Sequence, residues 1–221
     1  NALAPLHPQF DYLKNTVSVY NDYYRSFKGY KVTAEVYDIK SKKVWAKSRT
    51  VDLPEDGVAN DVFVIDFPAN ISQVHFIKLY LYDDRGKLVS DNFYWRSNDK
   101  YEGSKTLTGP TSSGFESLAD LKEVALKVKS GVSKKEDWQV MELSIQNPSS
   151  SIAFFVQLQY IDQNGKPVRP SFYSDNFFSL LPGESKKVVV ETALKNLPEK
   201  GRFIVKGWNV KSQDVKVVFA R

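Results

Sequence analysis

Short runs of alternating apolar and polar residues recur along the chain, and each run ends at a turn signal. In residues 31–38, Val32, Ala34 and Val36 fall on one face and polar or aromatic side chains fall on the other. Residues 75–83 alternate in the same way and lead into Asp-Asp-Arg-Gly, a sequence typical of a hairpin loop. A period of two residues predicts strands with one buried face. Runs this short, separated by turns, predict antiparallel sheets.

The alternation defines two groups of strands. The first group comprises residues 16–21, 31–38, 44–49, 62–67, 75–83 and 87–95. The second comprises residues 124–129, 138–146, 152–161, 172–180, 185–192, 202–210 and 215–219, after one short helical turn at 115–121. About seven short strands per group are typical of an immunoglobulin-like domain. We therefore predict an all-β chain of two immunoglobulin-like antiparallel β-sandwiches in tandem.

The length and one biased segment set the predicted domain boundaries. A chain of 221 residues accommodates two domains of ordinary size. Residues 98–114 are rich in Ser, Thr, Gly and Lys, a composition typical of a linker. We predict a first sandwich at 1–97, a linker at 98–114 and a C-terminal sandwich at 115–221.

A Ser-Asp-Asn step followed by aromatic residues occurs twice, at residues 90–92 and 174–176. Asp and Asn favour turns because their side chains bond nearby backbone groups, and aromatic residues favour strands. Each copy is therefore predicted to form a tight corner that leads into a strand.

Composition excludes several kinds of site. The chain has no cysteine and only two histidines, His7 and His75, so we predict no disulfide, no metal site, no cofactor and no Ser-His or Cys-His dyad. The net charge of +5 is spread over lysines at turns and strand ends, unlike a nucleic-acid-binding stripe. No apolar run approaches the roughly 20 residues of a membrane helix. We therefore predict neither nucleic acid nor membrane as a partner.

A series of motifs resembles a known family. It comprises residues 138–147, residues 152–156, Pro170, residues 174–185 and Gly-Trp-Asn-Val at 207–210. Together they resemble the C-terminal immunoglobulin-like domain of glycoside hydrolase family 2 exo-β-D-glucosaminidases, to which β-mannosidases are related. Residues 16–21, 36–38 and 90–95 are similar to the sandwich that follows the catalytic barrel in those enzymes.

The resemblance implies a parent enzyme whose catalytic residues lie outside this chain. Such enzymes use two glutamates of a (β/α)₈ barrel, one of them directly after Asn, and retaining glycosidases hold the two carboxyl groups about 5 Å apart. This chain has no Asn-Glu dipeptide, and its strands do not alternate with the helices that a barrel requires. We assign no catalytic residue and expect the fragment to be inactive alone.

The predicted function is a non-catalytic accessory region that supports the catalytic barrel of the same polypeptide. The start at Asn1-Ala2 without Met indicates a piece of a longer chain. The family implies a secreted or periplasmic location. Two alternatives remain open: a carbohydrate-binding β-sandwich with an oligosaccharide as its partner, and an adhesin-like, protein-binding pair of sandwiches.

One surface is the best candidate for contact with substrate: Phe172, Tyr173, Asp175 and Asn176. These residues precede a strand at one end of a sandwich, where loops gather and sites are commonly built. A purely structural corner is the favoured alternative, and the nearby Arg169 does not suit a cationic amino sugar.

Other residues have a functional and a structural interpretation as well. Asp91 and Asp175 suggest a carboxylate pair, but turn capping within separate modules is favoured. Tryptophans 45, 95, 138 and 208 offer faces for sugar rings, whereas core packing is favoured for Trp138 and Trp208 because they lie in alternating runs.

Overall fold

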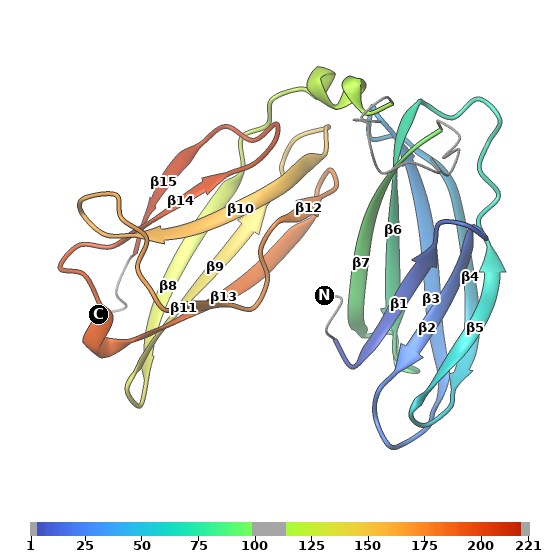
Figure 1. Ribbon diagram of the computed structural model, residues 1–221, viewed down its shortest axis with the longest axis horizontal. Helices are drawn as coiled ribbons and strands as arrows, with labels where there is room; N and C mark the ends of the chain where they lie inside the picture. The colour runs from blue at the N-terminus through green and yellow to red at the C-terminus, as the bar shows by residue number, and fades with distance from the viewer. Residues whose placement is uncertain (1–3, 99–113, 218–221) are drawn as a thin grey trace, which may run out of the picture. The chain divides into compact units, whose positions relative to one another are not determined.

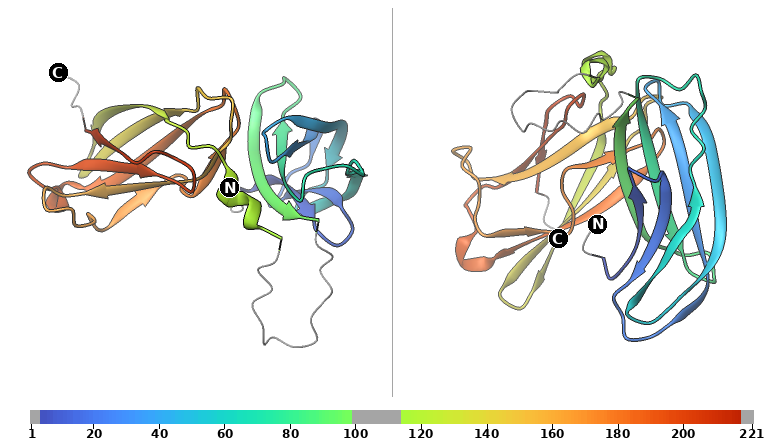
Figure 2. Two further views of the ribbon diagram at one scale, coloured as in Figure 1. Left: turned by 90° about the horizontal axis from the view of Figure 1, so that it is seen from above. Right: turned by 45° about the vertical axis from the view of Figure 1, so that its right-hand side comes forward.

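The computed structural model describes residues 4–98 and 114–217. It divides into two compact units, Asn1–Asp120 and Leu121–Arg221, called here the N-terminal and C-terminal units. Each unit is built from layered antiparallel strands (Figures 1 and 2). In the described ranges the only helices are the short 3₁₀ turns η1 (Glu116–Asp120) and η2 (Leu194–Asn196). The predicted all-β class with two sandwiches is confirmed, as is the helical turn near residue 116.

The N-terminal unit has two sheets with strand orders β1-β2-β5 and β4-β3-β6-β7. Its strands are β1 (Leu6–Asp11), β2 (Thr16–Asn21), β3 (Phe27–Asp38), β4 (Lys43–Leu53), β5 (Gly57–Val64), β6 (Val74–Tyr82) and β7 (Leu88–Ser97). Alternate residues of both sheets, among them Val17, Val36 and Leu79, are fully buried in one core. The period-two pattern therefore marks the inward faces, as expected for a sandwich.

The C-terminal unit has two four-stranded sheets with orders β12-β10-β14-β15 and β11-β13-β9-β8. Its strands are β8 (Lys127–Lys135), β9 (Trp138–Gln146), β10 (Ala153–Ile161), β11 (Ser171–Tyr173), β12 (Phe178–Leu180), β13 (Ser185–Ala193), β14 (Arg202–Lys206) and β15 (Gln213–Lys216). Met141, Leu143 and Ile145 of β9 meet Val156 and Phe203 of the facing sheet in a second core.

One prediction about the N-terminal unit is wrong, and one strand was not predicted. Residues 90–92 do not form a corner: they lie inside β7, where Ser90, Asp91 and Asn92 pair with Leu81, Tyr80 and Leu79 of β6. Strand β1 was not predicted, because Pro8 interrupts its pattern. Since β1 is the edge of its sheet, a residue without an N–H is tolerated there.

Two predictions about the C-terminal unit are also wrong. The single strand expected at 172–180 is two strands, β11 and β12, that belong to different sheets. The strand expected at 202–210 ends at Lys206, and Trp208 lies beyond it. The predicted corner at 174–176 does occur, between β11 and β12.

Part of the predicted organisation falls outside the description. Most of the linker predicted at 98–114 lies outside the described residues, as does the end of the strand predicted at 215–219.

Candidate functional site

The predicted surface at 172–176 lies where the chain passes from one sheet of the C-terminal unit to the other. β11 pairs with β13 in one sheet, and β12 pairs with β10 in the facing sheet. The residues between them make the crossing, so this corner joins the two layers of the sandwich.

Asn176 is the residue that makes the crossing possible. Its Nδ2 donates to the carbonyl of Leu158 at 3.0 Å, and its Oδ1 accepts from the N–H of Leu158 at 2.8 Å. Strand β12 pairs with β10 through Val156 and Phe178, so the side-chain amide occupies the next position of that ladder. Asn and Asp commonly replace backbone partners in this way. The role of Asn176 in the structure is therefore to form hydrogen bonds with the backbone N–H and carbonyl of Leu158 in β10.

Tyr173 and Asp175 also have partners within the protein. The Tyr173 hydroxyl accepts from the N–H of Tyr160 at 2.8 Å, and burial is the main cause that raises the pKa of this hydroxyl. The Asp175 carboxylate pairs with Lys186 Nζ at 2.7 Å. Phe172 instead stays exposed, with its ring 5.8 Å from that of Trp138 in an edge-on arrangement. Of the predicted residues, Phe172 offers the most free surface.

Next to this corner lies a group of exposed aromatic residues that we call the aromatic strip: Phe177, Phe155 and Trp208. They are 50%, 38% and 60% exposed, respectively. The rings of Phe155 and Phe177 are 5.5 Å apart. On the other side of β10, the N–H of Trp208 donates to the carbonyl of Phe154 at 3.0 Å, which places the backbone of Trp208 next to the residue before Phe155.

The backbone at two residues of the strip is strained. Phe155 and Phe177 both have φ of 56°, a conformation that bulky residues rarely adopt. The pairing of β10 with β12 shifts register between Ala153 and Val156, so Phe155 lies in a bulge that turns its side chain outward. Strain of this kind clusters at functional positions.

Only Trp208 of this strip was singled out in the sequence, and it was expected to be a core residue. Its side chain is exposed, so that prediction is wrong.

The aspartates of the two Ser-Asp-Asn motifs do not form a carboxylate pair. Asp91 forms an ion pair with Lys78 of the adjacent strand, so it does not cap a turn as predicted. Asp175 accepts from the N–H of Asn176 at 2.8 Å and pairs with Lys186. Each aspartate thus has a lysine partner in its own unit.

Two of the tryptophans lie in or near a core. Trp45 packs against the core of the N-terminal unit, and Trp138 is half-buried at the start of β9.

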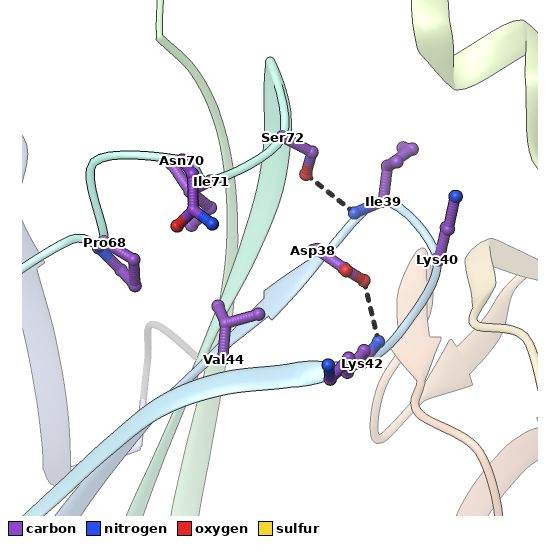
Figure 3. A pocket seen from close by; sticks show the side chains of 9 residues that line it. All are labelled: Asp38, Ile39, Lys40, Lys42, Val44, Pro68, Asn70, Ile71 and Ser72. Carbon is purple, nitrogen blue, oxygen red and sulfur yellow. Dashed lines mark hydrogen bonds between the residues drawn. The ribbon is translucent and has the colours of Figure 1, made fainter.

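A shallow cleft of about 310 Å³ opens at one end of the N-terminal unit, between the β3–β4 turn and residues 68–72 (Figure 3). The N–H of Ile39 donates to Ser72 Oγ at 2.9 Å, and the N–H of Lys42 donates to Asp38 Oδ1 at 2.8 Å. These hydrogen bonds hold the two loops in place. Asp38 is the one carboxylate that lines the cleft, so its lining does not provide a pair of acids.

Within the described ranges, no three His, Cys, Asp or Glu side chains are grouped closely enough to hold a metal ion. A search of the same residues finds no helix with the length and apolar character needed to cross a membrane.

Comparison with known proteins assigns each unit to a domain type. Residues 106–210 match the family described as the exo-β-D-glucosaminidase Ig-fold domain, and residues 14–101 match the mannosidase Ig/CBM-like domain. The chain is 26% identical to an exo-β-D-glucosaminidase of Amycolatopsis orientalis, over 97% of its own length and 22% of that relative. It is 27% identical to the Streptomyces avermitilis exo-β-D-glucosaminidase, over 97% of its length and 25% of that relative.

A solved structure resembles the whole chain. The crystal structure of the A. orientalis exo-chitosanase CsxA matches with a TM-score of 0.84 and 25% identity, over 97% of this chain and 26% of CsxA. The chain therefore spans about a quarter of the length of the relatives it matches. Those relatives are single chains that extend well beyond the matched region.

Proposed function

Because this chain is a tandem pair of Ig-like domains of the mannosidase and exo-β-D-glucosaminidase types, we propose that it is the non-catalytic accessory region of a family 2 glycoside hydrolase. Its partner is the catalytic barrel of the same polypeptide, and the parent enzyme removes β-linked glucosamine from the ends of chains. The observation that carries the proposal is the coverage: 97% of this chain matches 22% of an exo-β-D-glucosaminidase, and both domain types are present.

The chemistry of the described residues supports this role. A retaining glycosidase needs two carboxyl groups about 5 Å apart on a rigid scaffold. The two aspartates of the Ser-Asp-Asn motifs lie in different units, and each is neutralised by a lysine of its own unit. The two carboxylates of these motifs therefore do not form such a pair.

The test compares the polypeptide encoded by the complete gene with a version lacking these 221 residues. We expect the shortened protein to unfold at a lower temperature, while kcat on an aryl β-D-glucosaminide stays within about tenfold, since positioning effects of that size need no lost catalytic group. A loss of kcat of more than about a thousandfold, with an unchanged melting temperature, contradicts the proposal.

A second candidate function is carbohydrate binding, and the aromatic strip favours it. Neighbouring exposed rings such as Phe155 and Phe177 present apolar faces to the C–H faces of sugars. Isothermal titration calorimetry with chitosan and mannan oligosaccharides tests this function. Binding that Phe155→Ala removes and Phe172→Ala leaves unchanged supports it, because Phe172 is more exposed (56% against 38%) but lies on the other sheet. The absence of heat at millimolar ligand contradicts it.

We also propose that the parent enzyme works outside the cytoplasm, in the medium or the periplasm. This rests on the family resemblance alone. Fractionation of the source cells with an antibody to this chain tests it, and recovery of the protein only in the cytoplasmic fraction contradicts it.

A further inference from the structure

The outer face of one sheet in the C-terminal unit extends the aromatic strip with polar residues. In this sheet, β10 lies between β12 and β14 (Figure 1). Val156 and Leu158 of β10 are buried in the core. Because successive side chains of a strand point to opposite faces, Gln157 and Gln159 lie on the outer face. Both are half-buried, and they follow Phe155 of the strip at intervals of two residues.

The strands on either side of β10 add a ring and a lysine to the same row. Val156 pairs with Phe178 of β12, so the next step of this register sets Phe177 opposite Gln157. On the other side, Gln157 pairs with Lys206 of β14. An aromatic ring, an amide and an ammonium group therefore lie side by side across three strands.

The two glutamine amides are not used by the fold. Within the described ranges, neither the Gln157 nor the Gln159 side chain forms a hydrogen bond with another group of the protein. Each amide offers two donors and one acceptor without carrying a charge. Such groups suit the hydroxyl and acetamido groups of a sugar, which are also uncharged donors and acceptors.

The neighbouring rings supply the apolar part of a binding surface. Phe155 and Phe177 are exposed, and both have φ of 56°, which is unfavourable for a bulky residue. The fold thus retains a strained backbone that keeps two rings at the surface beside the amides. Aromatic side chains with a few placed polar groups are the usual lining of a small-molecule site.

The charge of this face indicates which kind of sugar it can accept. Lys206 is exposed and forms no ion pair within the part of the chain that the structure describes. Asp214 is the one carboxylate in the four strands of the sheet, and it pairs with Arg202 at 2.9 Å. No carboxylate of these strands is therefore left to bind an ammonium group, and a cationic sugar meets a positive potential.

We propose that Phe155, Phe177, Gln157 and Gln159 bind an uncharged glycan in preference to protonated glucosamine. The C–H face of a sugar packs on the two rings, and its hydroxyl or acetamido groups meet the two amides. The inference deepens the carbohydrate-binding function proposed above and rests on it. It gives this region a ligand that differs from the cationic sugar that the parent enzyme is proposed to release.

Isothermal titration calorimetry of the 221-residue chain with three trisaccharides tests the proposal. At about pH 5 the amino groups of chitotriose are protonated, whereas N,N′,N″-triacetylchitotriose has the same backbone without the charge. Cellotriose lacks both the charge and the acetamido groups. We expect triacetylchitotriose to bind at least about tenfold more tightly than chitotriose, since a like-charge contact near a surface costs about that factor. Cellotriose is also expected to bind more tightly than chitotriose.

Variants separate the amides from the charge. Gln157→Ala and Gln159→Ala are each expected to weaken the binding of triacetylchitotriose about threefold to tenfold, which is the worth of an ordinary hydrogen bond. Lys206→Glu is expected to strengthen the binding of chitotriose about tenfold. Lys129→Glu is the matched control, because Lys129 is exposed on β8 of the other sheet, and it is expected to change neither affinity. The melting temperature of each variant shows that it is folded.

Two results would overturn the proposal while carbohydrate binding itself still holds. One is an affinity for chitotriose equal to or above that for either uncharged trisaccharide, and the other is unchanged binding of triacetylchitotriose to both glutamine variants. The absence of heat with all three sugars at about 10 mM would overturn the proposal together with the carbohydrate-binding function. The accessory role is tested separately, by the shortened enzyme.

Discussion

Asparagine side chains replace backbone partners at several points of the C-terminal unit. Asn147 Nδ2 donates to the carbonyls of Ser151 and Leu180 at 2.8 and 3.0 Å. Asn209 joins the N–H of Phe154 to the carbonyl of Ile152, at 2.8 Å in each case. Asn176 does the same for Leu158. Each amide offers both a donor and an acceptor, which is what an interrupted ladder leaves unpaired.

The Asn176 amide gives the first prediction. Asn176→Ala leaves the N–H and carbonyl of Leu158 without these partners, so we expect a loss of about 1–3 kcal/mol in the free energy of unfolding. Urea denaturation measures the loss. Asn164→Ala, in the exposed loop after β10, is the control, with an expected change below about 0.5 kcal/mol. Equal effects of the two substitutions would show that the Asn176 amide does not hold the corner.

His75 gives a second prediction at the same scale. The ring is buried on β6 beside Phe67, with ring centroids 5.0 Å apart, and its Nε2 has no partner in the described residues. Burial, aided by the nearby Arg96, lowers the pKa of His75 from 6.5 to about 4. In the unfolded chain His75 is protonated below about pH 6.5, whereas in the folded unit it is protonated only below about pH 4.

We therefore expect the N-terminal unit to lose stability as the pH falls from 6.5 towards 4. The melting temperature, followed across this range by circular dichroism, measures the effect. His75→Phe removes the titrating group, and its melting temperature is expected to depend less on pH. An equally steep pH dependence in this variant would assign the effect to the carboxylates.

At the scale of strands, an ion pair joins two neighbours in the larger sheet of the N-terminal unit. Lys78 on β6 is 4% exposed and pairs with Asp91 on β7. An uncompensated charge at such a position is costly, whereas an apolar replacement of both partners is often neutral.

Asp91→Ala is accordingly expected to cost about 3 kcal/mol in the free energy of unfolding, because it leaves the Lys78 ammonium buried without its counter-charge. The double variant Lys78→Met, Asp91→Leu is expected to recover most of that loss. Chemical denaturation of the three proteins measures both effects. A double variant as unstable as Asp91→Ala would mean that the pair itself, and not the burial of a single charge, determines stability.

The strands that the sequence predicts best are those in which buried and exposed residues alternate without interruption. Residues 16–21 and 138–146 were predicted with the bounds that β2 and β9 have, because both alternate cleanly around a buried face. The break between β11 and β12 could not be predicted in this way. It depends on the Asn176 amide meeting Leu158, a contact between residues 18 positions apart.

The candidate site was predicted only in part for the same reason. The corner at 174–176 was recognised from its turn residues. The aromatic strip was not, because the outward turn of Phe155 depends on a register shift against β12. Trp208 lies in a run that alternates, but the strand ends before Gly207, where a Cβ would lie 2.8 Å from Val210 Cγ2. A local pattern does not report such close approaches.

At the scale of the whole molecule, each unit has its own two sheets and its own core. Domains built in this way generally fold alone. We expect residues 4–98 and residues 114–217, each produced separately, to unfold in a single cooperative transition. Calorimetry checks this expectation. A fragment that shows no transition, and lacks the near-ultraviolet circular dichroism of packed aromatic residues, would contradict it.

We propose that this chain lends structure, and not chemistry, to a glycoside hydrolase. Incubation of the purified 221-residue chain with p-nitrophenyl β-D-glucosaminide and the corresponding β-mannoside tests this proposal. We expect no p-nitrophenol release above the buffer rate for either substrate. Steady turnover that scales with the concentration of the chain, and that persists through a second purification step, would contradict it.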